Sequence, residues 1–405
     1  MIKIINEILD QMKRICKPQK KFIVHLMECI LAAHGKLNFR NISRYGVFTE
    51  KTISRNYRKE FDFAEFNGLL IKNKLSPTSR KIAAFDPTFI AKSGKHTIGI
   101  ASFWNGSAGR AEKGLEASLF CVVDVDSKAA YAISAAQTLD PDKNQAENGN
   151  AGDEETRIDV YLEHIVRDYK HLPPEVRHMG VDAFFTKSKF VHGTIKRTGL
   201  HVVGKMRIDA NLRFLFAGQQ SGKGRPKRFD GKFSVDDLSR LHDEGNTKNG
   251  KAKLYSCILY SVSLEMDLKI VVAITEHKGK VGTAILYSTD LTLGAFDLYE
   301  YYTSRFQIEF QFRDAKQFTG LDDCQARLPQ SINFHFNASF MALNLSRFMY
   351  HSGEPSDPFS MATIKARSYN ERLIECVFPM FGIDPTLIKD TPAYQTALNY
   401  GAIHV

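Results

Sequence analysis

The segment YYTSRFQIEFQFRDAK, residues 301–316, carries charged side chains through a background rich in phenylalanine. In a helix, each side chain is turned by about 100° from the previous one. On such a helix the polar residues fall within an arc of about 80°; they are Tyr302, Arg305, Glu309, Arg313 and Lys316. We therefore expect a mostly buried helix with one narrow polar stripe. The alternative, an exposed ladder of i,i+4 ion pairs, does not explain the aromatic flanks.

One carboxylate in a cationic stripe holds a divalent cation poorly, so Glu309 would need carboxylates from elsewhere. Asp86 and Asp182 each stand at the C-terminal end of an apolar run, KIAAFD and HMGVD. Three such groups could hold two Mg²⁺ ions about 4 Å apart, one activating an attacking oxygen and one stabilising the leaving oxygen of a phosphodiester. Oxygen ligands favour Mg²⁺, with Mn²⁺ as a substitute, over zinc. Each aspartate alone is also compatible with an ordinary turn.

The elements around the two aspartates predict how they are positioned. From residue 81 the chain shows short apolar runs separated by turn signals, which predict strands. Patterns of helix, strand, helix and strand follow. This order is typical of a ribonuclease-H-like α/β core, which we expect over residues 79–204. In such a core the two aspartates end neighbouring central strands, and a closing helix lays Glu309 over them.

The remaining chain divides into four predicted parts. We expect a helical domain over residues 1–78, a β-rich insertion over residues 205–295, the second part of the core over residues 296–345 and a helical region over residues 346–405. The predicted fold is therefore α/β, with a ribonuclease-H-like catalytic core interrupted by a β-rich insertion and flanked by helical N- and C-terminal regions.

Positive charge is concentrated near the N-terminus. The net charge is +10, and residues 1–80 hold 16 Lys and Arg against 7 Asp and Glu, a balance of +9. Such a segment suggests a nucleic-acid partner, although a solvated basic surface has the same composition. Two short helices joined at Gly46, the second with Arg55 and Arg58, suit a helix-turn-helix that binds duplex DNA; a plain helical bundle is the alternative. The insertion adds a basic loop with Lys223, Arg225, Lys227 and Arg228.

The sequence gives no support to several other classes of protein. No run of eighteen apolar residues occurs, and the N-terminal segment lacks an uncharged stretch before a cleavage site, so we expect neither membrane insertion nor export. The six cysteines are scattered, which argues against disulfides and zinc ribbons and fits a reducing cytoplasm. The segment GQQSGKG has the wrong spacing for a phosphate-binding loop, and no HExxH zinc motif occurs.

The spacing Tyr302-x2-Arg305-x3-Glu309-x6-Lys316 resembles the YREK signature of DDE transposases of the insertion-sequence-4 family, which are bacterial cut-and-paste enzymes. The segment FDPTFIAKSGKHT is similar to the first-aspartate segment of that family, VDAFFTKSKF to its second, and GKGRPKRFDGK to the basic loop of its insertion. The resemblance covers roughly residues 80–345. It also places the insertion between the second aspartate and the glutamate.

The resemblance implies a role for each of these residues. Asp86, Asp182 and Glu309 would form the catalytic, metal-binding triad for two Mg²⁺ ions, and Tyr302, Arg305 and Lys316 would contact DNA phosphates near the transposon end. The implied activity is metal-dependent hydrolysis at transposon ends, followed by strand transfer into target DNA. A homodimer in the synaptic complex and a bacterial, cytoplasmic, nucleoid-associated location are expected. A ribonuclease-H-like nuclease without strand transfer and a domesticated DNA-binding regulator are the alternatives.

One feature of the resembling family has no clear counterpart. Family members that form hairpin ends can flip a base onto a tryptophan in the insertion, but the single tryptophan here, Trp104, lies among the early core strands. We expect Trp104 to pack in the core. Tyr255, Tyr260 or Tyr287 could offer an aromatic surface to a base instead, so the excision intermediate stays open.

Overall fold

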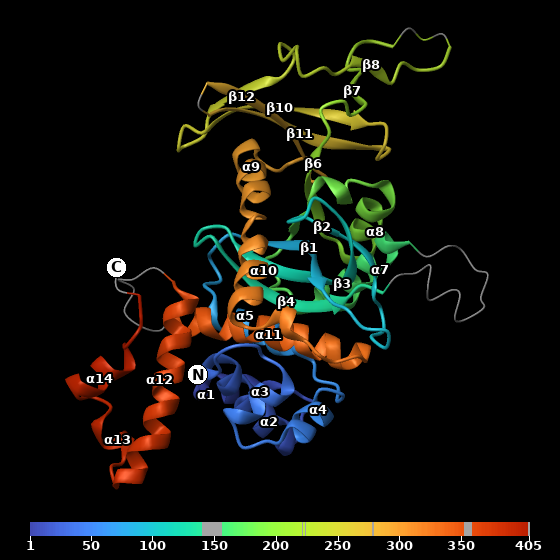
Figure 1. Ribbon diagram of the computed structural model, residues 1–405. Coiled ribbons are helices and arrows are strands. Elements are labelled where there is room, and N and C mark those ends of the chain that lie inside the picture. Colours follow the sequence, from blue (N-terminus) through green and yellow to red (C-terminus); the bar gives the residue numbers. More distant parts are fainter. Residues whose placement is uncertain (140–155, 221, 223, 278, 352–358, 404–405) are drawn as a thin grey trace.

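The computed structural model describes residues 1–139, 156–220, 222, 224–277, 279–351 and 359–403. Its described strands form one twelve-stranded mixed sheet, and helices cover the sheet and extend beyond one end of it (Figure 1). This mixed α/β architecture is consistent with the expected ribonuclease-H-like core. Within the described ranges no helix is both long and apolar enough to cross a membrane.

Helices precede the first strand: α1 (Ile2–Gln11), α2 (Lys17–Ala32), α3 (Phe39–Arg44), α4 (Glu50–Asn56) and α5 (Phe63–Lys74). The two shortest are capped at their N-termini, where Asn38 accepts a hydrogen bond from the backbone of Asn41 and Thr49 one from that of Thr52. Tyr57, which follows α4, is buried and packs on Phe334 with ring centroids 4.4 Å apart. This contact joins the N-terminal helices to helix α11 (Pro329–His351) and so to the core.

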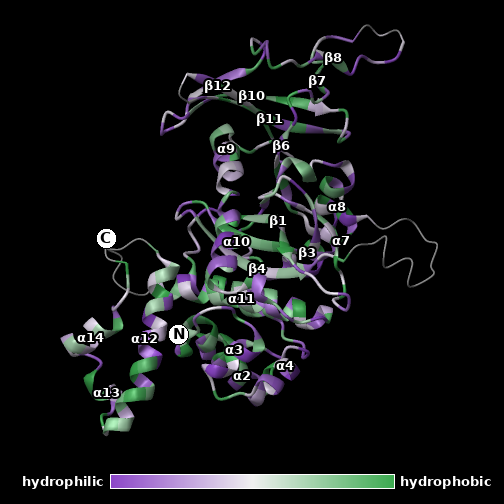
Figure 2. Ribbon diagram, viewed as in Figure 1, coloured by the Kyte–Doolittle hydropathy of each residue, from purple (hydrophilic) through white to green (hydrophobic). Residues whose placement is uncertain are grey.

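The central strands lie in the order β4, β3, β1, β5, β6. Their bounds are β1 (Lys81–Ala91), β3 (Arg110–Asp124), β4 (Ala129–Gln137), β5 (His178–Gly180) and β6 (His201–Met206), and β2 (Ala101–Asn105) pairs with the start of β3. Neighbours among β4, β3 and β1 are antiparallel, whereas β5 and β6 continue parallel to β1. Helices α7 (Arg157–Asp168) and α8 (Ser188–Thr198) precede and follow β5. Hydrophobic residues run along these strands (Figure 2) because both faces of the sheet are covered.

The predicted insertion contributes strands that extend the central sheet. They are β7 (Leu212–Leu215), β8 (Phe229–Lys232), β9 (His242–Asn246), β10 (Ala252–Ser261), β11 (Met266–His277) and β12 (Lys280–Ser288). The junction is an antiparallel pairing of β12 with β6, in which Ile285 lies opposite Met206 and Ser288 opposite Val203. The sheet then continues through β11, β10 and β7 to β8, at the end of the molecule far from the N-terminal helices (Figure 1).

The expectation of one continuous helix over residues 301–316 is wrong. The segment is divided between α9 (Ala295–Ser304) and α10 (Gln307–Phe318). At the junction the Phe306 N–H bonds the Thr303 carbonyl at 3.3 Å, and the Ile308 N–H bonds the Arg305 carbonyl at 3.0 Å. These i→i−3 bonds wind the chain more tightly than an α-helix. A single helical projection therefore cannot describe both halves of residues 301–316. Phe306, expected on the apolar side, is 54% exposed.

Helix α11 covers the outer edge of β4 with a row of asparagines. Asn333, Asn337 and Asn344 are spaced so that they share one helix face. Asn337 accepts from the N–H of Ala135 at 2.8 Å and donates to its carbonyl at 2.7 Å; Asn344 does the same for Ala132 at 2.9 and 2.8 Å. The amides thus take the place of a neighbouring strand and satisfy buried backbone groups at a sheet edge.

The chain after residue 359 packs beside the N-terminal helices. It forms α12 (Met361–Val377), the 3₁₀ turn η4 (Phe378–Phe381), α13 (Pro385–Ile388) and α14 (Pro392–Leu398). Lys365 of α12 donates to the carbonyls of Ile30 and Ala33 at 2.8 and 2.7 Å. These carbonyls end helix α2, where a cation is favoured by the helix dipole.

Candidate active site

Asp86 and Asp182 come from neighbouring parallel strands at the centre of the sheet. Strands β1 and β5 are in register with Ala84 opposite Gly180. Continuing this register by two residues sets Asp86 opposite Asp182, just beyond the end of β5. Asp182 is fixed locally, because its Oδ1 accepts the backbone N–H of Ala183 at 2.7 Å. Two carboxylates that are far apart in the sequence therefore meet at one edge of the parallel strands.

The two faces of β1 have different surroundings, because successive side chains on a strand point to opposite sides. Phe85 points toward α7 and the 3₁₀ turn Ala183–Phe185 before α8. Its ring centroid lies 5.7 Å from that of Tyr161 in α7 and 5.6 Å from that of Phe185 in the turn. Asp86 points to the other face, and its Oδ2 lies 3.3 Å from Nη1 of Arg305. The carboxylate is thus directed at the junction between α9 and α10.

Glu309, in the first turn of α10, completes a cluster of three carboxylates. The charges of Glu309 and Asp182 both act on Asp86, so the three carboxyl groups lie near one another. Burial is the largest cause of the strongly raised pKa of Asp86; Glu309 and Asp182 raise it further, and the positive charge of Arg305 opposes them.

Gly180 allows the α9–α10 junction to lie close to the sheet. A Cβ atom at this position would lie 3.3 Å from Cβ of Arg305 and 3.4 Å from Cδ1 of Ile82. Because the interior is close-packed, a side chain here would displace one of these neighbours. Sequence reasoning missed this residue, although the glycine in HMGVD, two positions before Asp182, was a usable signal.

Arg305 pairs with a carboxylate in the structure. Its side chain is 11% exposed, and its guanidinium lies 3.3 Å from Asp86 and 5.9 Å from the ring centroid of Tyr302. In the described part of the chain its Nε has no hydrogen-bond partner. A guanidinium carries five donors, so the ion pair with Asp86 leaves donors for a second anionic group.

Lys316 fastens the second half of α10 to the sheet. Its Nζ donates to the carbonyl of Phe89 on β1 at 2.7 Å. Burial lowers the pKa of Lys316, and the negative charges of Asp322 and Glu309 act against that shift. An ammonium group has three donors, so this bond restrains α10 without using the whole capacity of the side chain.

The carboxylate cluster fits a divalent cation in the kind of ligand that it offers. Asp86, Asp182 and Glu309 supply only oxygen, as Mg²⁺ and Mn²⁺ prefer, and a cation would relieve the repulsion that raises the pKa of Asp86. As arranged, the described residues contain no group of three or more His, Cys, Asp or Glu side chains poised to hold a metal ion. Because Arg305 is already paired with Asp86, a bound cation would have to share the Asp86 carboxylate with the guanidinium of Arg305.

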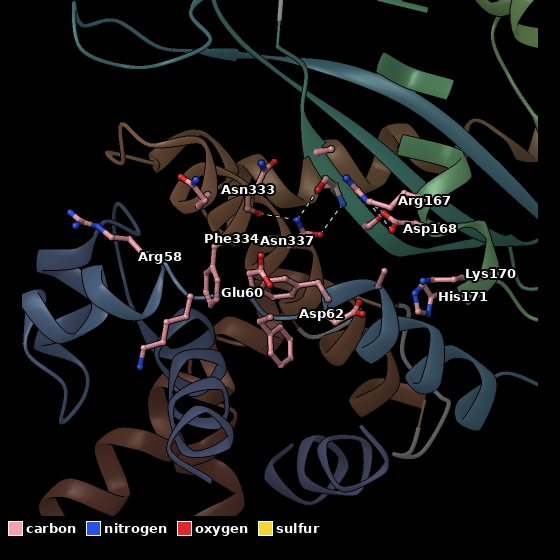
Figure 3. A pocket seen from close by; sticks show the side chains of 18 residues that line it. Arg58, Glu60, Asp62, Arg167, Asp168, Lys170, His171, Asn333, Phe334 and Asn337 are labelled. Carbon is pink, nitrogen blue, oxygen red and sulfur yellow. Dashed lines mark hydrogen bonds and ion pairs between the residues drawn. The ribbon is translucent and has the colours of Figure 1, made fainter. Parts of the chain in front are cut away.

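The predicted DNA-binding residues of the N-terminal region lie apart from this cluster. Arg55 lies in the last turn of helix α4, and Arg58 follows the helix. Arg58 is at the rim of a cleft of about 480 Å³ that Asp168 and Asn337 also line, between the N-terminal helices, the edge of β4 and α11 (Figure 3). The cleft contains both basic and acidic side chains, so it offers no uniform charge to a polyanion.

The basic loop of the predicted insertion lies at the other end of the molecule, before β8 (Figure 1). Arg225, Lys227 and Arg228 are exposed, and the guanidinium of Arg228 lies 4.4 Å from the ring centroid of Tyr260. Lys223 lies outside the described residues. The structure brings the three carboxylates together and places the two predicted basic surfaces on either side of them.

The expectation that Trp104 packs in the core is wrong. Trp104 is 63% exposed. Strand β2 pairs with β3 and directs the neighbouring Phe103 into the interior, so Trp104 points outward. Among the tyrosines considered as base-stacking surfaces, Tyr287 is fully buried, whereas Tyr255 and Tyr260 are partly exposed. Tyr287 therefore has no ring face for a base in this conformation.

Comparison with known proteins gives a family match over part of the chain. A search of curated proteins finds no match. Residues 58–254 match the family model described as DDE superfamily endonuclease. The matched region contains Asp86 and Asp182 and ends before Glu309. Such endonucleases generally use divalent metals and act on DNA. The match supports a DDE transposase-like protein with a nuclease type of activity.

Proposed function

We propose that this protein is a DNA transposase that hydrolyses phosphodiesters at transposon ends and transfers the freed strands into target DNA. The observation that carries the proposal is the meeting of Asp86, Asp182 and Glu309 on one face of the sheet. These residues come from three separate elements, and Glu309 belongs to the Tyr-Arg-Glu-Lys spacing, which runs from α9 into α10. That spacing, which resembles the insertion-sequence-4 family, favours strand transfer over simple cleavage.

In this proposal, Asp86, Asp182 and Glu309 hold two Mg²⁺ ions, with Mn²⁺ as a substitute. When bound, such ions activate the attacking oxygen and stabilise the leaving oxygen of the phosphodiester. In the first reaction a water oxygen bonds to phosphorus and the bond to the 3′-oxygen breaks, leaving a 3′-hydroxyl. In the second reaction this hydroxyl attacks a target phosphodiester and displaces a new 3′-oxygen.

The surrounding residues position the substrate and screen its charge. We assign Tyr302 and Arg305 to phosphates near the transposon end. Arg305 pairs with Asp86 and retains unused donors, and the ring of Tyr302 lies 5.9 Å from its guanidinium. Lys316 holds α10 against β1 and can offer its remaining donors to a phosphate. Preorganised cations of this kind stabilise the charge of a phosphoryl transition state without reorganisation.

We assign duplex binding to the two basic surfaces, one with Arg55 and Arg58 and the other with Lys223, Arg225, Lys227 and Arg228. Two transposon ends must be held together for concerted transfer, so the proposed active form is a homodimer on DNA. Exposed arginines and lysines next to aromatic rings, such as Arg228 beside Tyr260, are suited to phosphate and sugar contacts.

One assay tests the proposed function. The purified protein is incubated with Mg²⁺, a DNA fragment carrying the terminal repeats that flank its gene, and a target plasmid. Cleavage with joining supports transposition, cleavage without joining supports a nuclease, and binding without cleavage supports a regulator. Glu309→Gln should abolish cleavage and retain end binding. Glu300→Gln is the matched control and should cleave normally, because Glu300 is a partly buried glutamate of the preceding helix that pairs with Arg80.

A further inference from the structure

A second cleft, of about 620 Å³, is lined in part by helix α10, the helix that carries Glu309. Its walls come from α10, α11 and the N-terminal end of α12. Arg313, on its rim, stands four residues after Glu309 and therefore on the neighbouring part of the helix surface. The cleft thus adjoins the face of α10 that carries the catalytic glutamate of the proposed site.

Arg347 is a buried cation in the wall of this cleft. The residue is 9% exposed, and its Nε has no hydrogen-bond partner among the residues that the structure describes. Its Nη2 lies 3.6 Å from Oδ2 of Asp314, which is too long for a hydrogen bond. The guanidinium also lies 4.5 Å from the ring centroid of Phe359. A buried charge with unused donors is costly, so an anionic acceptor in the cleft would be favoured.

The N-terminus of α12 adds a second source of positive potential. This helix has 17 residues, and its N-cap Ser360 accepts the N–H of Thr363. The N–H groups of Met361 and Ala362, which both line the cleft, have no partner within the helix. Exposed N–H groups at the start of a helix, together with the helix dipole, form a binding site for phosphate oxygens.

The charges around the cleft favour a single anionic group. Arg313 and Arg347 carry two positive charges against the one carboxylate of Asp314, which lies 2.8 Å from Arg313. One positive charge and the dipole of α12 therefore remain. Phe310 and Phe359 supply apolar walls on which a sugar or a base could pack.

We propose that this cleft binds a phosphate group through Arg347 and the N-terminal N–H groups of α12. A DNA phosphodiester and a free nucleotide share this chemistry. The inference rests on the proposed function only in taking DNA as the source of the phosphate group. A DNA strand that passes Glu309 can cross Arg313 and place a phosphate in the cleft. The site would then fix the position of DNA next to the reacting phosphodiester.

Calorimetric titration of the full-length protein with inorganic phosphate, without DNA or Mg²⁺, tests the site itself. Arg347→Met and Ala362→Asp should weaken binding at least tenfold. An aspartate near a helix N-terminus stabilises the helix while competing with the anion, so Ala362→Asp should stay folded even if Arg347→Met does not. Arg372→Met is the matched control. Arg372 lies on α12, as Ala362 does, and like Arg347 it forms a long ion pair, 3.7 Å from Glu375. Equal phosphate affinity in all four proteins would overturn the proposal.

The source of the phosphate is tested with a fluorescent duplex oligonucleotide. If DNA occupies the cleft, Ala362→Asp should weaken duplex binding and reduce its salt dependence by about one ion, whereas Arg372→Met should not. Loss of phosphate binding with unchanged duplex binding would contradict DNA as the source and would assign the cleft to a free nucleotide. Neither titration needs cleavage, so a failure here is distinct from a failure of Glu309→Gln to abolish cleavage.

Discussion

The properties of the candidate site arise from a few side chains that constrain one another. Asp86 lies partly buried among two other carboxyl groups and one guanidinium, and its raised pKa reflects loss of solvent first and the carboxylates second. Arg305 lies close over Gly180 while it pairs with Asp86. The arrangement of these charges therefore depends on residue 180, where the absence of a side chain lets Arg305 approach the sheet.

Gly180→Ala should lower DNA cleavage while the protein stays folded. The added methyl group would lie 3.3 Å from Cβ of Arg305 and would push the α9–α10 junction away from the sheet, moving Glu309 relative to Asp86. Because small misplacements of catalytic groups are costly, we expect a loss of about tenfold or more. Cleavage rates and thermal melting would be measured together. Gly106→Ala is the control, since a Cβ there meets no atom within 4 Å; equal rates in both variants would contradict the account.

His164 makes the protein sensitive to acid. It is buried between Ser118 and Ser134, at 2.8 and 2.9 Å, and burial is the main reason that its pKa falls from 6.5 to about 3. Below pH 6.5 the unfolded chain binds a proton at this residue that the folded chain does not, so stability falls as the pH drops toward 3. Between pH 6.5 and 5 this loss is about 2 kcal/mol.

Urea unfolding at several pH values would measure this effect. His164→Gln should be less stable at pH 7 and should lose less stability than the wild type on acidification. The exposed His34→Gln should keep the wild-type slope. Parallel pH profiles for His164→Gln and the wild type would show that the histidine is not the source.

At the scale of the elements, two structural features set the positions of the site residues. The asparagine row of α11 satisfies the outer edge of β4, which fixes one border of the sheet. The tight turn at Arg305 and Phe306 then sets α10 at its own rotation relative to α9. Lys316, bonded to Phe89, holds α10 in that orientation.

Asn344→Ala tests how much the asparagine row of α11 contributes to stability at the edge of β4. It would remove the hydrogen bonds to the N–H and the carbonyl of Ala132 and to the side chain of Asn67. Leaving buried polar groups unpaired should lower the free energy of unfolding by about 2–4 kcal/mol. Chemical denaturation would measure the change, with the exposed Asn6→Ala expected to stay within about 0.5 kcal/mol of the wild type. A similarly small effect at Asn344 would show that the row is dispensable.

The contrast between strands and helices shows what the sequence could predict. The apolar runs that end at Asp86 and Asp182 are local patterns, and both form strands in the structure. Strand β5 ends just before Asp182, but β1 continues past Asp86 to Ala91, so the expectation that Asp86 ends its strand is wrong. The break at Arg305 and Phe306 has no local signal, because both residues are compatible with a helix and the tight turn accompanies the packing of Arg305 over Gly180. Trp104 was misjudged for a similar reason: only the strand pairing reveals that β2 turns Phe103 inward and Trp104 outward.

At the scale of the whole molecule, the sheet separates two basic surfaces and carries the carboxylate cluster between them (Figure 1). This spacing suits a long DNA substrate that spans the protein. The C-terminal region presents apolar side chains to solvent, with Met380, Phe381 and Leu387 between 75% and 81% exposed. Exposed apolar groups close together are typical of protein interfaces. A second copy of the chain, which the proposed synaptic complex requires, is the partner that we assign to them.

Phe381→Asp should therefore weaken self-association on DNA. Light scattering after gel filtration with a duplex oligonucleotide would show a dimeric complex for the wild type and a monomeric one for the variant. Val281→Asp, which alters a 70% exposed residue on β12, should remain dimeric. A monomeric wild-type complex, or a dimer unaffected by Phe381→Asp, would contradict this assignment.

The central claim is that Asp86, Asp182 and Glu309 bind metal together, and metal-directed cleavage of the polypeptide tests it most directly. Fe²⁺ replaces Mg²⁺, and ascorbate with peroxide generates hydroxyl radicals that cut the chain close to the bound ion. We predict cuts near residues 86, 182 and 309 in the wild type, competed by Mg²⁺ and weakened in Glu309→Gln, with Glu300→Gln unchanged. Cuts elsewhere, or the same cuts in Glu309→Gln, would contradict the claim.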